Sequence, residues 1–156
     1  YPKQKEILSE ETAFMMTNLM QTVIDRGTGG SVRWKYNFYH PAAGKTGTTQ
    51  GWTDAWFVGF STQIAAGAWF GIDDPQVSLG KGADGTRAAL PAWARFMKTA
   101  HDSLYYSKEK FQQPEKVQTF SICQVSKEKP TPLCPLEKEL FILGTDPSRL
   151  CKIHRR

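Results

Sequence analysis

The sequence contains no run of apolar residues long enough to span a bilayer or to act as a secretion signal. It opens on Tyr1-Pro2 and not on methionine, so we expect it to be a piece of a longer protein. A dense basic patch is also missing, because the net charge of +5 is spread along the chain except for cations such as Lys127 and Lys152 near its end. This charge disfavours nucleic acid as a partner and suits anionic surfaces such as lipid headgroups or cell-wall polymer.

Cysteine is scarce, and its number is odd. Cys123, Cys134 and Cys151 cannot all pair within one chain. Together with His154 they could hold a structural zinc, since three sulfurs and one imidazole are a known tetrahedral set. The ten residues between Cys123 and Cys134 exceed the usual spacing of about two to four. The sequence therefore favours free thiols, or a Cys123–Cys134 disulfide across a hairpin turning near residues 127–130, over a metal site.

What the sequence does contain predicts an α+β domain followed by an extension. Its 156 residues are 40% hydrophobic, enough for one core, but nine prolines indicate that part of the chain does not pack. Ser9 and two following acids begin a helix predicted over residues 10–26. The aromatic segment 31–41 is expected to be a connector or an irregular strand.

Beyond residue 42 the apolar pattern changes to a period of two, which predicts strands at 43–49, 54–61 and 64–72 in an antiparallel meander. Apolar residues at helical spacing then predict a helix over 88–105 that covers this sheet. After residue 108 the composition turns to Lys, Gln and Pro, and only Val117 to Val125 alternates like a strand. We therefore divide the chain into a domain over 1–108 and an extension over 109–156.

Residues 44–49 read Gly-Lys-Thr-Gly-Thr-Thr and fall on the first predicted strand. An edge strand can pair with an extended peptide, and Gly47 keeps that approach free of a Cβ atom. Lys45 supplies a positive charge for a carboxylate and can depress the pKa of nearby proton-transfer groups. Thr46 and Thr48 offer hydroxyl donors, and the Thr48 N–H suits one of the two donors of an oxyanion hole.

Three common residues such as Lys-Thr-Gly also meet by chance, and Lys45 would then be a solvated strand residue. The context favours a functional motif, because a second strand follows after a short turn. Asp54 in that strand either orients Lys45 or caps the turn. Thr49 completes the set of substrate-binding candidates, after Thr46 and Gly47.

The motif and its surroundings resemble a known family. Residues 42–74 contain Asp-Ala-Trp-Phe-Val-Gly-Phe and Ala-Trp-Phe-Gly-Ile-Asp-Asp-Pro, and they closely resemble class A penicillin-binding proteins. The resemblance covers residues 7–100 and, more loosely, the cysteine-bearing tail. It implies that 1–108 is the C-terminal part of a transpeptidase domain of the penicillin-binding protein and serine β-lactamase fold.

The resemblance also implies a reaction in peptidoglycan synthesis. A serine attacks a D-Ala-D-Ala stem peptide, D-Ala leaves, and the acyl group passes to an amine; β-lactams acylate the same serine. Lys45, Thr46 and Gly47 match the third family motif, and Thr48 matches the position whose N–H completes the oxyanion hole. The family implies no metal or organic cofactor and an extracytoplasmic location, with an anchoring segment that this sequence does not contain.

The other family motifs are not found where the mechanism needs them. Ser-x-x-Lys, which carries the nucleophile, should precede Lys-Thr-Gly, with Ser-x-Asn between the two. The Ser-Lys-Glu-Lys strings at 107–110 and 126–129 both follow it, in polar sequence that predicts surface loops. No Ser-x-Asn occurs. We therefore expect a missing N-terminal part of the same protein to supply the nucleophile, and this chain alone to be inactive.

Two other functions stay open. A D,D-carboxypeptidase or β-lactamase relative would share Lys-Thr-Gly, and a non-catalytic cell-wall-binding module would need no serine.

The remaining polar and aromatic residues are expected to have structural roles. His40 and His101 are predicted to be polar surface or loop residues. Most of the five tryptophans are predicted to be core, although the four that flank the motif strand, Trp34, Trp52, Trp56 and Trp69, could line a groove for glycan or peptide.

Overall fold

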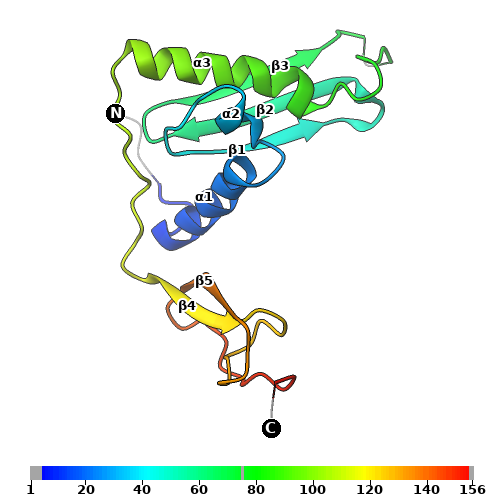
Figure 1. The fold of residues 1–156 in the computed structure, drawn as a ribbon. Helices are drawn as coiled ribbons and strands as arrows, with labels where there is room; N and C mark the ends of the chain where they lie inside the picture. The colour runs from blue at the N-terminus through cyan, green and yellow to red at the C-terminus, as the bar shows by residue number, and fades with distance from the viewer. Residues whose placement is uncertain (1–4, 75, 155–156) are drawn as a thin grey trace. The chain divides into compact units, whose positions relative to one another are not determined.

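The computed structural model describes residues 5–74 and 76–154, which belong to two units. One unit is residues 16–111, and the other combines residues 1–15 with 112–156 (Figure 1). Within the described residues, no helix has both the length and the apolar character that a membrane crossing requires.

Two helices precede the sheet. The predicted first helix is confirmed as α1, Glu10–Asp25, and the Ser9 hydroxyl accepts a hydrogen bond from the Thr12 N–H at 3.3 Å, as an N-cap does. The segment expected to be a connector or an irregular strand instead begins with a short helix, α2, Ser31–Trp34. Arg33 explains why no strand follows, because its Nη1 donates to the carbonyl oxygens of Phe38 and His40 at 2.8 and 2.7 Å.

The predicted antiparallel meander is confirmed to within one residue at each end. Its strands are β1 (Ala42–Thr48), β2 (Asp54–Ser61) and β3 (Ala65–Gly71), in the order β1-β2-β3. Along β2, alternate residues from Ala55 to Ser61 are buried, as expected when one face of a sheet meets the core. The α+β class follows from this sheet and the helices around it.

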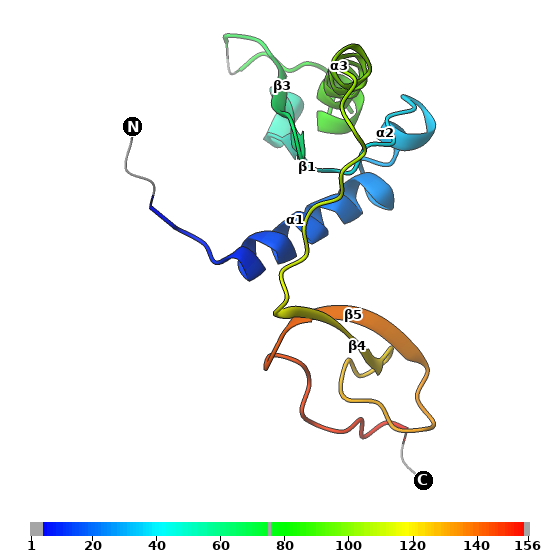
Figure 2. The same ribbon diagram turned by 90° about the vertical axis from the view of Figure 1, so that its left-hand side faces the viewer.

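The buried face of the sheet is covered by α3, Leu90–Ser103, which corresponds to the helix predicted over 88–105 (Figure 2). Trp93 is the largest buried side chain, and its Nε1 donates to the Ala66 carbonyl oxygen at 3.0 Å. A Cβ atom on Gly59 would lie 2.8 Å from the Trp93 ring. The helix can therefore approach the sheet this closely only because residue 59 is glycine.

The second unit contains a two-stranded antiparallel sheet of β4 (Val117–Cys123) and β5 (Leu136–Ile142). The strand predicted over 117–125 is β4, which ends two residues earlier, and the hairpin expected to turn near residues 127–130 is present. Cys123 pairs with Leu136, so residues 124–135 connect the two strands, and the predicted turn lies in the middle of this connection. Lys129 in this connection also forms a bridge with Leu150, and its N–H donates to the Arg149 carbonyl oxygen at 2.9 Å.

Two histidines lie inside the core of the first unit, so neither is the surface residue that was one alternative; His40 lies in the loop before β1, as the other alternative expected, whereas His101 lies in α3. His40 and His101 are 8% and 1% exposed, with ring centroids 4.5 Å apart. His101 bonds through Nδ1 to the Met97 carbonyl oxygen at 2.7 Å and through Nε2 to the Ser61 hydroxyl at 2.9 Å. Among the described atoms, His40 Nδ1 is buried without a hydrogen-bond partner. His101 is therefore a core histidine with both ring nitrogens hydrogen-bonded, whereas the His40 ring stacks on Phe38 with its Nδ1 unsatisfied.

This burial makes the stability of the first unit depend on pH. Removal from water lowers the pKa of His40 below its usual 6.5; His101 and Lys108 lower it further, while the Ser107 backbone and Asp102 oppose the change. The unfolded chain then binds a proton that the folded chain does not. We expect the free energy of unfolding to fall as the pH drops below about 6.5 and to level off below the lowered pKa.

Urea titrations at a series of pH values measure this dependence. Tryptophan fluorescence reports the correct unit, since all five tryptophans lie between residues 16 and 111. His40→Asn removes the titrating ring and should flatten the slope below pH 6.5 relative to the unchanged protein. An equal slope in both proteins would show that His40 is not the responsible group.

Candidate active-site strand

The Lys-Thr-Gly motif lies on β1, at the edge of the three-stranded sheet. Only one side of this strand is paired, because the strand order places β2 next to it and no other described strand beyond it. The buried part of β1 is its beginning, from Ala42 to Gly44, whereas Lys45 is exposed. The small residues before the motif thus anchor the strand in the core, and the motif itself extends toward the surface.

The ladder between β1 and β2 determines which backbone groups of the motif are open. Thr49 N–H donates to the Asp54 carbonyl oxygen at 3.1 Å, and hydrogen-bonded pairs alternate along an antiparallel ladder. Lys45 and Gly47, which pair with Val58 and Trp56, therefore direct their backbone groups toward β2. The backbone N–H and C=O groups of Thr46 and Thr48 consequently face the unpaired edge. The role of the Thr48 N–H as an oxyanion donor stays a prediction.

The side chain of Lys45 lies along its own strand. Its Nζ donates to the Thr46 carbonyl oxygen at 2.9 Å and to the Thr46 hydroxyl at 3.3 Å. Asp54 does not orient it, because Asp54 Oδ1 accepts from Trp69 Nε1 at 2.9 Å and Oδ2 accepts from the Thr53 hydroxyl at 3.1 Å. No ion pair of Lys45 is found in the described part of the chain. Its positive charge is thus not neutralised by a neighbouring carboxylate.

Thr48 is held by a segment far away in the sequence. The helical turn η2, Gly85–Ala89, leads into α3, and the Gly85 N–H donates to the Thr48 hydroxyl oxygen at 3.1 Å. Asp84 caps this turn by accepting from the N–H groups of Thr86 and Arg87, both at 2.9 Å. The hydroxyl hydrogen of Thr48 is not used by this bond and can be donated to a ligand.

The two remaining predicted residues have different surroundings. Gly47 is half-buried, and a Cβ atom there would come within 3.2 Å of the Trp56 Cβ. Thr49 lies one residue beyond β1, where its hydroxyl is 2.7 Å from the Thr53 hydroxyl and accepts from the Asp54 N–H at 2.8 Å. Thr49 therefore closes the turn between β1 and β2, and its substrate-binding role stays a prediction.

The face of the sheet that carries Lys45 and Gly47 also carries exposed aromatic rings. Trp56 and Trp69 are 44% and 45% exposed, and their ring centroids are 6.1 Å apart. The prediction that most tryptophans are core is wrong for the described chain, where Trp93 alone is buried. No helix of the core cluster covers this face, because α3 packs on the opposite one.

The candidate serines are not placed as nucleophiles. Ser107 is exposed and donates to Glu109 Oε1 at 2.8 Å, and Ser126 lies in a turn after β4. Both strings thus lie outside helices and strands, as predicted. A third Ser-x-x-Lys string, Ser78 to Lys81, was not anticipated. It lies in an exposed loop, where the Ser78 hydroxyl donates to the Gly51 carbonyl oxygen at 2.6 Å. None of the three begins a helix or faces a buried lysine.

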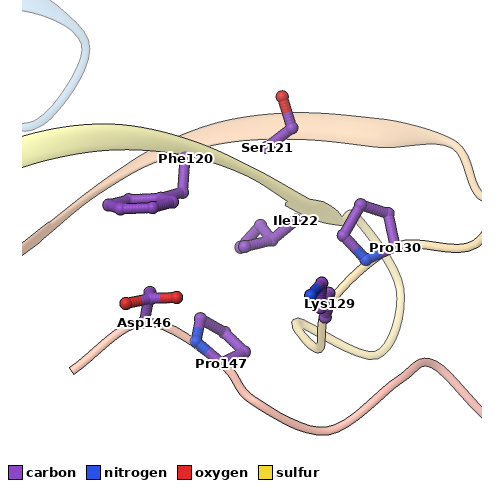
Figure 3. A pocket seen from close by; sticks show the side chains of 7 residues that line it. All are labelled: Phe120, Ser121, Ile122, Lys129, Pro130, Asp146 and Pro147. Atoms are coloured by element: carbon purple, nitrogen blue, oxygen red, sulfur yellow. The ribbon is translucent and has the colours of Figure 1, made fainter. Parts of the chain in front are cut away.

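The second unit has a pocket and a cysteine cluster of its own. The pocket has a volume of about 330 Å³, and Figure 3 shows the Phe120 ring and Asp146 on its opposite sides. The pocket lining includes none of the serines of the three Ser-x-x-Lys strings. Nearby in sequence, Cys123 and Cys134 are free thiols, which is one of the two alternatives that the sequence favoured, and no disulfide joins them.

An α+β sheet with Lys-Thr-Gly on its open edge is characteristic of transpeptidase-type domains. A family model described as "Penicillin binding protein transpeptidase domain" matches residues 1–97, and "Penicillin-binding protein 1A, C-terminal domain" matches residues 113–156. The chain therefore belongs to the penicillin-binding protein transpeptidase family and corresponds to a C-terminal part of its class A members.

Individual relatives are similar along nearly the whole chain. Penicillin-binding protein 1A of Aquifex aeolicus is 33% identical over 150 residues, which cover 96% of this chain and 20% of that protein. Its counterpart in Haemophilus influenzae is 32% identical over 153 residues, or 92% of this chain and 17% of that protein. A crystal structure of Haemophilus influenzae penicillin-binding protein 1A matches with a TM-score of 0.82 at 30% identity, over 93% of this chain and 22% of that one. The chain thus spans about a fifth of the length of these relatives.

The contact between η2 and β1 predicts a glycine requirement far from the motif. A Cβ atom at position 85 would lie 2.3 Å from the Trp56 carbonyl oxygen and 2.8 Å from that of Gly47. Gly85→Ala should push η2 off the strand and lower the free energy of unfolding by about 1–3 kcal/mol. Chemical denaturation measures this loss.

Gly67→Ala on β3 is the matched control for that substitution. The nearest atom to its new methyl group would be Val58 Cγ2, at an ordinary contact distance of 3.7 Å. We expect this variant to be as stable as the original protein within about 0.5 kcal/mol. Equal losses in both variants would contradict a specific contact at Gly85.

Proposed function

We propose that this chain carries the third-motif strand of a D,D-transpeptidase that crosslinks peptidoglycan. The substrate is a stem peptide ending in D-Ala-D-Ala, and β-lactams bind at the same place as its mimics. Lys45 supplies the positive charge beside the reacting group, and the Thr48 N–H is one of two oxyanion donors. Thr46, Gly47 and Thr49 contact the substrate along the strand.

The observation that carries this proposal is the open edge of β1. Its outward N–H and C=O groups at Thr46 and Thr48 match the needs of an extended peptide, which binds a sheet edge by adding a strand. The exposed lysine beside them has no carboxylate partner in the described chain, so it is available for the terminal carboxylate of a peptide. A lysine on a central strand, paired on both sides, would have no open backbone groups beside it for a peptide to bind.

The nucleophile in this proposal belongs to polypeptide that precedes the present sequence in the same protein. That part contributes Ser-x-x-Lys and Ser-x-Asn and packs on the exposed sheet face around Trp56, Val58 and Trp69. Reaction at the cell wall requires an extracytoplasmic location on the outer side of the cytoplasmic membrane, with the anchor in the preceding part. The C-terminal unit is an accessory domain of the same synthase.

The chain by itself should not react covalently with penicillin. Incubation with a fluorescent penicillin, followed by gel electrophoresis and peptide mass spectrometry, is expected to give no labelled band. The serines at 78, 107 and 126 are exposed or have local hydrogen-bond partners, and none of them has a buried lysine beside it. A labelled peptide containing one of these serines would contradict the proposal.

Joined to its upstream part, the same chain should become reactive, and Lys45 should then control the rate. Lys45→Ala is expected to lower the rate of acylation by a fluorescent penicillin by roughly 100-fold, the usual size of a lost electrostatic contact in acyl transfer. Stopped-flow fluorescence measures this rate. Lys81→Ala, in an exposed loop, is the matched control and should react at the original rate. Equal rates for all three proteins would refute the role of Lys45.

A further inference from the structure

Four potential metal ligands meet in the second unit, although they are far apart in the sequence. Cys123 ends β4, Cys134 lies in the connection to β5, and Cys151 and His154 follow the bridge between Lys129 and Leu150. Their three Sγ atoms and one imidazole nitrogen all lie within 4.8 Å of one another. The fold therefore brings together a Cys₃His set from three separate segments.

The distances among Cys123, Cys151 and His154 are those of one face of a tetrahedron around an ion, and Cys134 Sγ lies within 4.8 Å of all three. Cys123 Sγ and Cys151 Sγ are 3.6 Å apart, and each lies 3.5 Å from His154 Nδ1. Zinc bonds of about 2.3 Å to sulfur and about 2.0 Å to nitrogen give tetrahedral edges of roughly 3.8 Å between sulfurs and roughly 3.5 Å between sulfur and nitrogen. Hydrogen bonding alone does not require all four atoms to converge on one point.

We infer that Cys123, Cys134, Cys151 and His154 bind one zinc ion that holds the C-terminal unit together. Three thiolates and an imidazole in a tetrahedral arrangement are ligands that select zinc over magnesium or calcium. Four protein ligands fill the coordination sphere and leave no position for a substrate, so the site is structural and has no part in the transpeptidase reaction.

The composition of the unit's interior supports a stabilising metal. Its buried apolar residues in the described range, besides the three cysteines, are Val117 and Ile122. The unit contains 60 residues, 1–15 and 112–156, and small domains with so little apolar burial commonly add a disulfide or a metal. No disulfide joins its cysteines. The sulfur cluster therefore takes the place that aliphatic side chains have in a larger domain.

The surroundings of the ligands fit thiolates that carry negative charge. Backbone N–H groups of Ser126 and Thr131 donate to Cys123 Sγ and Cys134 Sγ at 3.5 and 3.3 Å. The Thr131 hydroxyl also donates to the His154 carbonyl oxygen at 2.7 Å, which ties the last ligand to the loop that carries Cys134. Such contacts around the ligands orient them before the ion binds.

Binding follows a balanced exchange of protons and involves no oxidation. Each thiol loses its proton to solvent as its sulfur bonds to Zn²⁺, while His154 coordinates as the neutral ring. The site then has a net charge of −1, from three thiolates and one divalent ion. Exposed lysines at 129 and 152 lie close to the ligands in the sequence and offset this charge, whereas Lys127 is paired with Glu137.

Metal analysis of the whole chain tests the inference directly. The protein is produced in zinc-supplemented medium, purified under reducing conditions without chelator, and measured by inductively coupled plasma mass spectrometry. We expect about one zinc per chain, three thiols that react with a thiol reagent only after chelation, and a tetrahedral absorption spectrum after cobalt exchange. Metal-free protein would overturn the inference, and equimolar iron or copper would overturn the assignment to zinc.

Two substitutions distinguish the four-ligand zinc site from nonspecific zinc binding. His154→Ala removes a ligand and should lower zinc affinity at least 10-fold, measured by competition with a chromophoric chelator. Lys152→Ala, between Cys151 and His154, is the matched control and should bind zinc as the original chain does. If His154→Ala unfolds the unit, the stoichiometry of the unchanged protein still decides the question. Equal affinity in both variants would refute the four-ligand site.

Discussion

The hydrogen-bond ladder between β1 and β2 is the constraint on which the rest of the first unit depends. Its register pairs Thr46 with Phe57 and Lys45 with Val58, so Phe57 enters the core while Lys45 reaches solvent. A shift of one residue would exchange the two faces and bury the lysine. The turn in which Thr49 bonds to Asp54 prevents that shift, because both the backbone and the hydroxyl of Thr49 are engaged there. The candidate site is therefore defined by a turn outside the Lys-Thr-Gly motif itself.

Packing on the opposite face fixes the ladder in place. Trp93 of α3 contacts the sheet where Gly59 provides room, and η2 reaches Thr48 through the Gly85 N–H. The turn η2 and the helix α3, which follow the motif by some forty residues, thus support β1 on its buried face and leave its outer edge unpaired. In this arrangement the helix contributes rigidity, and the edge strand keeps its backbone groups available for recognition.

Local patterns in the sequence predicted most of the first unit. The N-cap at Ser9 and the period of two after residue 42 indicate elements that the structure confirms to within one or two residues. Contacts between distant residues were not predictable in this way. Arg33 donates to the Phe38 carbonyl oxygen in the segment where a strand was one alternative, and no periodicity shows that His40 packs against Phe38. Lys45 was correctly expected on an edge strand, whereas the support of Thr48 by Gly85 depends on a contact 37 residues away in the sequence. Spacing along the chain also does not show that the chain beyond the bridge between Lys129 and Leu150 brings Cys151 Sγ to 3.6 Å from Cys123 Sγ.

The open edge of β1 has a cost that follows from its chemistry. The same outward amide and carbonyl groups that suit an extended peptide are equally complementary to a strand from a second copy of the sheet. Both kinds of partner would use the same backbone atoms, so these atoms alone do not distinguish peptide capture from self-pairing. Selectivity must come from bulk placed beside the strand, which admits a single slender chain and rejects a whole folded sheet.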